Sequence, residues 1–197
     1  LGGLSNDAMG NHSCVSGGQH NTAEAGFSSI SGGAYNIASG DYASISGGSW
    51  STASGPVSSI LGGYGHEATG NSSCISGGYT NIASGDISSI SGGEDNTALG
   101  EKSSVFGGFN NTVEGEYSCV SGGSNNTASG NGSSVTGGSN NIASGLSSTV
   151  TGGYNNETSG GNGSSESSLT VNKNENITVT VGGGGAGGGS ANAGSTG

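Results

Sequence analysis

Hydrophobic residues are sparse in this chain, and they recur at a fixed interval of 15 residues. Small polar residues flank the central aliphatic residue in most repeats, as in Ser29-Ile30-Ser31. One apolar side chain between two polar ones is the alternation of a strand with one buried face. With Ser13 as position 1 of the repeat, we therefore predict a short strand and a buried aliphatic ladder at position 3: Val15, Ile30, Ile45, Ile60, Ile75, Ile90, Val105, Val120, Val135 and Val150.

A second strand is predicted around position 11, where most repeats have Ala. The pattern there is Ile/Thr-Ala-Ser, as in Ile82-Ala83-Ser84, and Ala is expected to point inward and face the aliphatic residue across a thin core. A Gly-Gly pair at positions 5 and 6 separates the two strands, and a further Gly, such as Gly85, usually stands at position 13. Because glycine reaches positive φ without strain, we expect these glycines to form the two turns of the repeat.

The period continues without insertion or deletion from the first residues to about residue 160. Fifteen residues are too few for a helical hairpin, and the glycines would destabilise helices. We therefore predict an all-β protein, a parallel β-solenoid (β-roll) of about eleven coils stacked about 4.8 Å apart. Stacking turns position 9 into a ladder of asparagines that should bond along the axis: Asn21, Asn36, Asn81, Asn96, Asn111, Asn126, Asn141 and Asn156.

The pattern divides the chain into three segments. Residues 1–160 form the solenoid, and residues 161–182 contain two predicted strands, at 169–171 and 177–181, that read as a short β-hairpin. This hairpin is expected to cap the last coil, pair with another subunit or begin a further domain. Residues 183–197 are rich in Gly, Ala and Ser and are predicted to be a flexible tail or linker.

Charge narrows the classes of partner. The chain has 13 acidic and 2 basic residues and a net charge of −11. Such a chain is not expected to bind nucleic acid or anionic membrane surfaces, and no stretch is long and apolar enough to insert into a membrane. Because the sequence begins within a repeat and without Met, we expect a processed product or a fragment of a longer protein.

Catalytic and metal-binding patterns are not found. His12, His20 and His66 occupy different positions of different coils and are not expected to converge on a metal. Acidic residues such as Asp41 and Asp86 do not form the regular ladder of a calcium-binding solenoid. The serines have no His or Asp at a repeating offset, which a nucleophile requires. We therefore predict a protein that is not an enzyme and has no cofactor.

Three cysteines, Cys14, Cys74 and Cys119, all replace serine at position 2. They are four and three coils apart, about 19 and 14 Å along the axis, whereas a disulfide needs Cα atoms within about 7 Å. No intrachain disulfide is therefore expected. Each thiol is predicted to remain free or to meet a cysteine of a neighbouring chain.

Eight Asn-x-Ser/Thr sequences are candidate N-glycosylation sites. Several fall at predicted turn corners, namely position 14 or position 8, from which a glycan would project without disturbing the ladder. The candidates are Asn11, Asn71, Asn110, Asn125, Asn131, Asn156, Asn162 and Asn176.

Large apolar residues cluster at predicted corners. Three interpretations stay open: they cover the turns, they form a seam between chains, or they stack against glycans. The thin core, with one aliphatic residue and one Ala per coil, favours burial of further apolar surface against another copy. The candidate surface for self-association or glycan stacking comprises Phe27, Tyr42, Val57, Ile87, Tyr117, Tyr35 and Trp50.

The sequence Ser28-Ser29-Ile30-Ser31-Gly32-Gly33, followed by Asn36-Ile37-Ala38-Ser39-Gly40, resembles the head repeat of YadA-like trimeric autotransporter adhesins. The repeats are also similar to Ser/Asn/Gly-rich repeats of large secreted algal and viral surface proteins. The adhesin resemblance covers residues 1 to about 160 and implies a left-handed roll, a homotrimer and a role in adhesion. Gly32 departs from that family, which usually has a second aliphatic residue there.

These observations lead to three hypotheses of function. The first is a non-catalytic extracellular or cell-surface structural protein, a fibre or shaft whose open coil edges favour head-to-tail growth. The second is an adhesin head that binds a cell-surface glycan or matrix protein through its serines and aromatic residues. The third is ice binding by a flat Ser-Ile-Ser array, which Leu61 and Phe106 interrupt.

Overall fold

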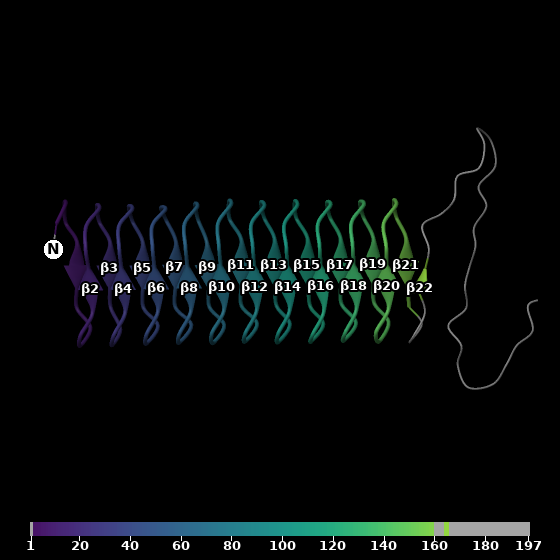
Figure 1. Ribbon diagram of the computed structural model, residues 1–197, viewed down its shortest axis with the longest axis horizontal. Coiled ribbons are helices and arrows are strands. Elements are labelled where there is room, and N and C mark those ends of the chain that lie inside the picture. Colours follow the sequence, from purple (N-terminus) through teal and green to yellow (C-terminus); the bar gives the residue numbers. More distant parts are fainter. Residues whose placement is uncertain (1, 160–163, 166–197) are drawn as a thin grey trace, which may run out of the picture.

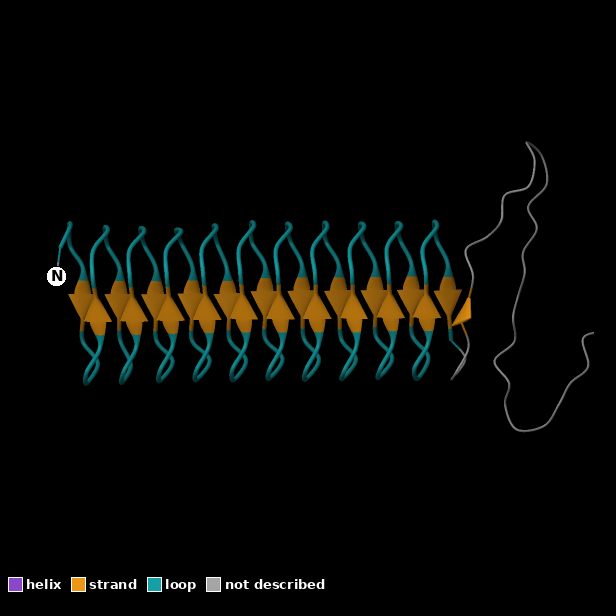
Figure 2. Ribbon diagram, viewed as in Figure 1, coloured by secondary structure: helices purple, strands orange, loops and turns teal. Residues whose placement is uncertain are grey.

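A computed structural model describes residues 2–159 and 164–165 and shows a parallel β-solenoid with one coil per 15 residues. Two sheets of 11 strands run along the whole stack, and loops project on both sides of them (Figures 1 and 2). Every strand is two residues long and pairs in parallel with the strand 15 residues away, as Ile75 does with Ile90. The predicted fold class is confirmed. The predicted hairpin lies outside the described residues.

The strands follow one another at the two expected sites of each coil. The first sheet contains β1 (Asp7–Ala8), β3 (Thr22–Ala23), β5 (Ile37–Ala38), β7 (Thr52–Ala53), β9 (Glu67–Ala68), β11 (Ile82–Ala83), β13 (Thr97–Ala98), β15 (Thr112–Val113), β17 (Thr127–Ala128), β19 (Ile142–Ala143) and β21 (Glu157–Thr158). The second contains β2 (Cys14–Val15), β4 (Ser29–Ile30), β6 (Ser44–Ile45), β8 (Ser59–Ile60), β10 (Cys74–Ile75), β12 (Ser89–Ile90), β14 (Ser104–Val105), β16 (Cys119–Val120), β18 (Ser134–Val135), β20 (Thr149–Val150) and β22 (Ser164–Ser165).

The core lies between the two sheets. The ten aliphatic residues at position 3 are all buried, and they share one apolar cluster with the alanines of position 11. Val113 takes the place of Ala in one coil and is equally buried. The core is one aliphatic residue and one small residue wide, so its stability depends on repetition along the axis.

Backbone hydrogen bonds run along the axis and join each coil to the next. Most N–H groups donate to the following coil, as Ser31 N does to the Ile45 carbonyl at 2.9 Å. The corner residues at positions 8 and 15 do the opposite: Tyr35 N donates back to the Gln19 carbonyl and Tyr42 N to that of Gly26, both at 2.9 Å. These corner residues have positive φ, which turns their N–H groups toward the preceding coil.

Glycine has two different roles in the coil: position 13 lies in the second turn as predicted, since the Gly40 carbonyl accepts from Ala43 N at 3.0 Å, but it does so without positive φ. The second Gly of each pair, such as Gly93, has positive φ, as expected of a turn residue. The Gly at position 13 does not; the second turn places its positive φ at position 15, on residues such as Tyr42 and Ile87. Gly85 is required for another reason: a Cβ atom there would lie 2.1 Å from the Gly100 carbonyl oxygen of the next coil. Position 13 therefore permits close stacking of coils.

Candidate functional site

The described residues contain no group of three or more His, Cys, Asp or Glu side chains that could hold a metal ion. The histidines lie apart: His12 and His20 are at opposite corners of the coil, and His66 is fully buried. No helix long and apolar enough to cross a membrane is found in residues 2–159 and 164–165. The features available for function are therefore the internal polar ladders, the corners and the outer faces of the stack.

The asparagines of position 9 form an internal ladder, but its bonds differ from the expected side-chain chain. Asn111 Oδ1 accepts from the backbone N–H of Asn126 in the next coil at 3.0 Å. Asn111 Nδ2 donates to the carbonyls of Gly107 and Gly123, each at 3.1 Å. Each asparagine thus joins its own Gly-Gly turn to that of the next coil. Side chains bond to one another only at some steps, such as Asn96 to Asn111.

His66 replaces asparagine in this ladder and takes over its acceptor function. Its Nδ1 atom accepts from Asn81 N at 3.1 Å, as an asparagine Oδ1 does elsewhere. Its buried Nε2 atom lies on the side of the Gly78 backbone, where an asparagine would place Nδ2, without a hydrogen bond of good geometry. Burial lowers the pKa of His66 below its ordinary value, against smaller opposing effects of the Gly78 and Asn81 backbones. The neutral imidazole with a bare Nδ1 is the form that fits.

A second buried polar column was not predicted from the sequence. The serines of position 1 are almost all buried between the position 13 turn and the core. Ser28 Oγ donates to the Ala25 carbonyl at 2.7 Å and Ser118 Oγ donates to the Gly115 carbonyl, whereas the Oγ atoms of the other buried serines of this column have no hydrogen-bond partner. Ala43 occupies the same position in one coil and is also buried. The sequence signal was the preference for Ser or Ala, the two smallest side chains, at a position beside a close turn.

Aromatic residues stack into rows along the corners. At position 8, the rings of His20 and Tyr35 are 4.8 Å apart and those of Tyr35 and Trp50 are 4.4 Å apart, with interplanar angles of 21° and 10°. At position 7 of the next two coils, Tyr64 and Tyr79 stack at 5.1 Å. We call these five residues the aromatic edge. Because each ring covers the face of its neighbour, the row presents mainly ring edges outward.

The opposite corner carries a similar row with charges beside it. His12, Phe27 and Tyr42 stack at centroid distances of 5.0 and 4.8 Å. Acidic residues stand next to this row at position 14, and the Asp41 carboxylate accepts from Gly26 N at 3.1 Å. The remaining position 15 residues of the candidate surface, Val57, Ile87 and Tyr117, are exposed on the same corner.

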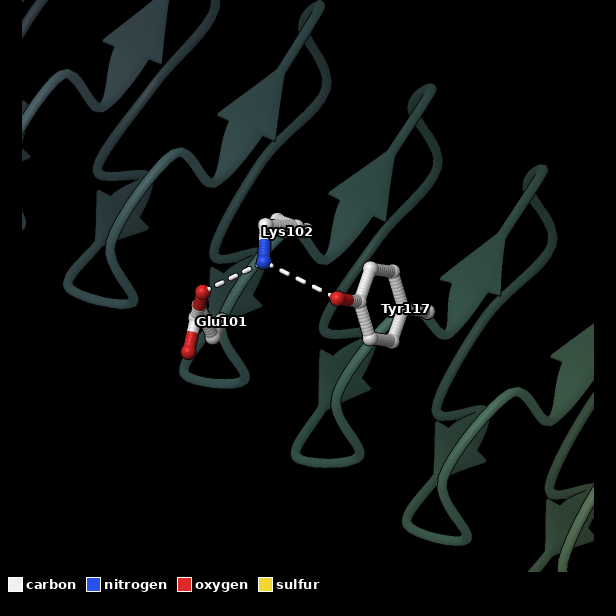
Figure 3. Close-up of polar contacts among 3 residues, drawn as sticks. All are labelled: Glu101, Lys102 and Tyr117. Carbon is white, nitrogen blue, oxygen red and sulfur yellow. Dashed lines mark hydrogen bonds and ion pairs between the residues drawn. The ribbon is translucent and has the colours of Figure 1, made fainter.

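Lys102 is the one basic residue on this corner among the described coils, and its ammonium group binds two neighbours (Figure 3). Nζ donates to Glu101 Oε1 at 2.6 Å and to the Tyr117 hydroxyl at 2.9 Å, and it lies 4.7 Å from the Tyr117 ring centroid. The hydrogen bond to Glu101 is the main cause that raises the pKa of Lys102, followed by that to Tyr117. An exposed ion pair of this kind contributes little to stability, so the cluster orients side chains rather than forming a reactive site.

The candidate glycosylation sites differ in their surroundings. Asn11, Asn71 and Asn131 are exposed at position 14 and are 60 residues apart, which is four coils or about 19 Å. Asn110 and Asn125 are exposed on adjacent coils, and Asn110 Nδ2 donates to Asn125 Oδ1 at 2.7 Å. Asn156 belongs to the internal ladder, where its Nδ2 donates to Gly152 and Asn141. Asn162 and Asn176 lie outside the described residues.

The three cysteine thiols are free and lie in separate coils of the second sheet. Cys74 and Cys119 are half-buried, and burial raises the pKa of both thiols, while Cys14 is exposed. In the outer face of this sheet, Leu61 and Phe106 project from position 4 and break the row of serines. That face is therefore not a uniform hydroxyl array of the kind that ice binding was expected to require.

No protein family model matches the chain, and a comparison with curated protein sequences found no significant match. The class of protein that the fold defines is a parallel β-solenoid repeat protein with about ten turns of 15 residues.

Proposed function

We propose that this protein is a non-catalytic structural element of the extracellular space or cell surface, a stiff rod that self-associates into a fibre or shaft. The observation that carries the proposal is the uninterrupted register of 11 strands in each sheet, with every corner and both strands of each coil bonded to the next. Such a stack has one extended dimension, about 50 Å for the described coils. A regular stack of this kind provides length, stiffness and a repeating surface.

The internal polar ladders favour a structural role over a catalytic one. The Asn side chains form hydrogen bonds to the Gly-Gly turns of their own coil and the next coil, so they are not free to act on a substrate. Self-association would add apolar burial that the thin core lacks, because exposed corner residues such as Trp50 and Tyr35 would then be covered.

Electron microscopy of the purified full chain, followed by fibre diffraction of concentrated samples, tests this proposal. We expect rods or filaments, with a meridional reflection near about 4.8 Å from coils stacked along the axis. Compact particles without a long axis, or rods that stay separate at every concentration, would count against a fibre-forming role.

The proposal includes N-glycosylation at the exposed corners of the coil. We expect N-glycans at the exposed corner asparagines if the protein passes through a secretory pathway that attaches them, and Asn11, Asn71 and Asn131 would then form one evenly spaced row. Asn156 is expected to remain bare, because a glycan on Nδ2 would displace the bonds to Gly152 and Asn141. Peptide mapping by mass spectrometry of the native protein checks both statements.

A second candidate is an adhesin head that binds glycan or matrix protein, favoured by the exposed aromatic rows. The open ring face on the position 8 row is that of Trp50, because the next coil has Gly65 at position 8 and no side chain to cover it. Replacement of Trp50 by Asn should abolish glycan binding if this candidate is right. If the variant binds a glycan array as the wild type does, Trp50 is not the glycan-binding residue.

A further inference from the structure

The aromatic residues at position 8 of the aromatic edge adopt a backbone conformation that is unfavourable for them, and the turn does not require aromatic side chains. His20, Tyr35 and Trp50 have φ of 53°, 57° and 59°, a conformation that Gly and Asn adopt most readily. The later coils place Asn at this same position, at Asn110, Asn125, Asn140 and Asn155. The first three complete coils therefore carry large aromatic side chains where a small polar residue would serve the turn as well.

The aromatic edge also has no acidic residue, although nearly all charged residues of the molecule are acidic. From Gln19 to Thr80, positions 7 and 8 hold no Asp, Glu, Lys or Arg over five coils. The uncharged strip ends at the next coil, where Glu94 and Asp95 occupy the two positions. The chain as a whole has a net charge of −11, so two copies would repel one another along most other surfaces. Along this strip they would not.

The shape of the strip fits one kind of partner. Stacked rings at centroid spacings of 4.4 to 5.1 Å form a ribbed surface with the period of the coils. The three stacked pairs cover six of the ten ring faces, so a sugar or other flat ligand finds only single, separated faces open rather than a continuous platform. A second copy of the chain presents ribs of the same period and matches the strip along its whole length. We propose that the aromatic edge is the site where a second copy docks, with the two rods antiparallel and Trp50 near the two-fold axis.

Charge selects the antiparallel arrangement. A parallel pair that met along this edge would place Glu94 and Asp95 of one copy against the same residues of the other. In an antiparallel pair centred on Trp50, the coil of Glu94 instead lies opposite the uncharged Leu4 and Ser5 of the partner copy. A two-fold contact of this kind is self-complementary and closed. The contact covers only the first half of each rod, so the second halves project in opposite directions and leave their corners free.

The strip is about 24 Å long and only two positions of the coil wide, so it buries less area than the interface of a stable dimer. We therefore expect weak, concentration-dependent dimers. Sedimentation velocity over a concentration series measures them directly. Trp50 is the single tryptophan of the chain, so its emission should shift to shorter wavelength as the dimer forms. A monomer at all concentrations, or an emission maximum that does not move with concentration, overturns the proposal.

Matched variants locate the contact. The double variant Tyr35→Asn/Trp50→Asn uses the residue that other coils have at position 8, and we expect it to lower the association constant at least tenfold. The control Phe27→Asn/Tyr42→Asn removes the same kind of stacked row from the acidic corner and should associate like the wild type. Circular dichroism checks that both variants remain folded, and if the first does not fold, the wild-type emission series decides. Equal association of the two variants overturns the assignment.

The orientation is tested by distance measurement between spin labels. The three cysteines are replaced by Ser, which other coils have at position 2, and one label is attached through Ser139→Cys. Six coils separate Ser139 from Trp50, so antiparallel rods place two labels roughly 60 Å apart, whereas parallel rods place them within about 20 Å. A short distance overturns the antiparallel arrangement. The inference rests on the proposed self-association but fails separately from it. A Tyr35/Trp50 variant that dimerises like the wild type and still forms filaments would retain the fibre and overturn the assignment of this edge.

Discussion

At the scale of single residues, the distance between coils decides which glycines are indispensable. A Cβ at Gly85 would lie 2.1 Å from the Gly100 carbonyl oxygen, whereas a Cβ at Gly77 would meet nothing within 4 Å. We expect Gly85→Ala to lower the free energy of unfolding by more than about 2 kcal/mol. Gly77→Ala is the matched control and should change it by less than about 1 kcal/mol in either direction. Urea unfolding followed by circular dichroism measures both, and similar losses would show that coil spacing is not the cause.

His66 gives the rod a pH dependence of stability. Its pKa in the folded state is lowered by burial, so the unfolded state binds more protons below about pH 6.5. Stability should therefore fall as the pH falls through about 6.5 and stop falling, for this group, once the lowered folded pKa is passed. The loss can reach about 1.4 kcal/mol per pH unit.

The variant His66→Asn introduces the ladder residue that most coils have, such as Asn81 in the next coil, and should remove this part of the pH dependence. His20→Asn, at the half-buried corner, is the control and should keep it. Unfolding curves at pH 7 and pH 5 give the comparison. Equal losses in the wild type and His66→Asn would mean that the buried imidazole does not control acid stability.

At the scale of the element, the asparagine ladder joins neighbouring turns. Asn111→Ala would leave Asn126 N without its acceptor and the Gly107 carbonyl without a donor, and the Gly123 carbonyl would keep only the bond from Phe109 N. We expect a loss of about 1–3 kcal/mol in the free energy of unfolding. The adjacent Asn110 is exposed at a φ of 51°, so Asn110→Gly should have little effect. Thermal melts of the two variants would reveal whether position 9 or simply amide content stabilises the turn.

The strand sites, the buried ladder at position 3 and the parallel stacking were predictable, because strict 15-residue periodicity makes like residues neighbours. What the pattern did not reveal depends on how closely coils approach. The periodicity shows that position 13 is small but not that Gly85 contacts Gly100, and it marks Asn111 as a ladder residue without naming its backbone partners. The stacked row from His20 to Trp50 also escaped prediction, because it depends on positive φ at corners that no glycine marks.

At the scale of the whole molecule, the coil is the unit that can be added or removed. Deletion of residues 91–105 joins position 3 of one coil to position 4 of the next and preserves the register. We expect the variant to fold with a slightly lower melting temperature and a rod shorter by about 4.8 Å. Deletion of residues 91–104 is the control, because a one-residue slip moves inward-facing side chains outward. Small-angle X-ray scattering and circular dichroism should separate the two, and equal behaviour would contradict coil modularity.

The axial direction of the backbone hydrogen bonds has a mechanical consequence. A pull on the two ends of the chain loads the bonds of one coil boundary at a time, since each coil contacts only its neighbours. The rod would then unfold one coil at a time, and each step would release roughly 45 Å of extended chain. A fibre built this way yields in small equal increments rather than by sudden rupture, and it lengthens severalfold while its remaining coils stay intact.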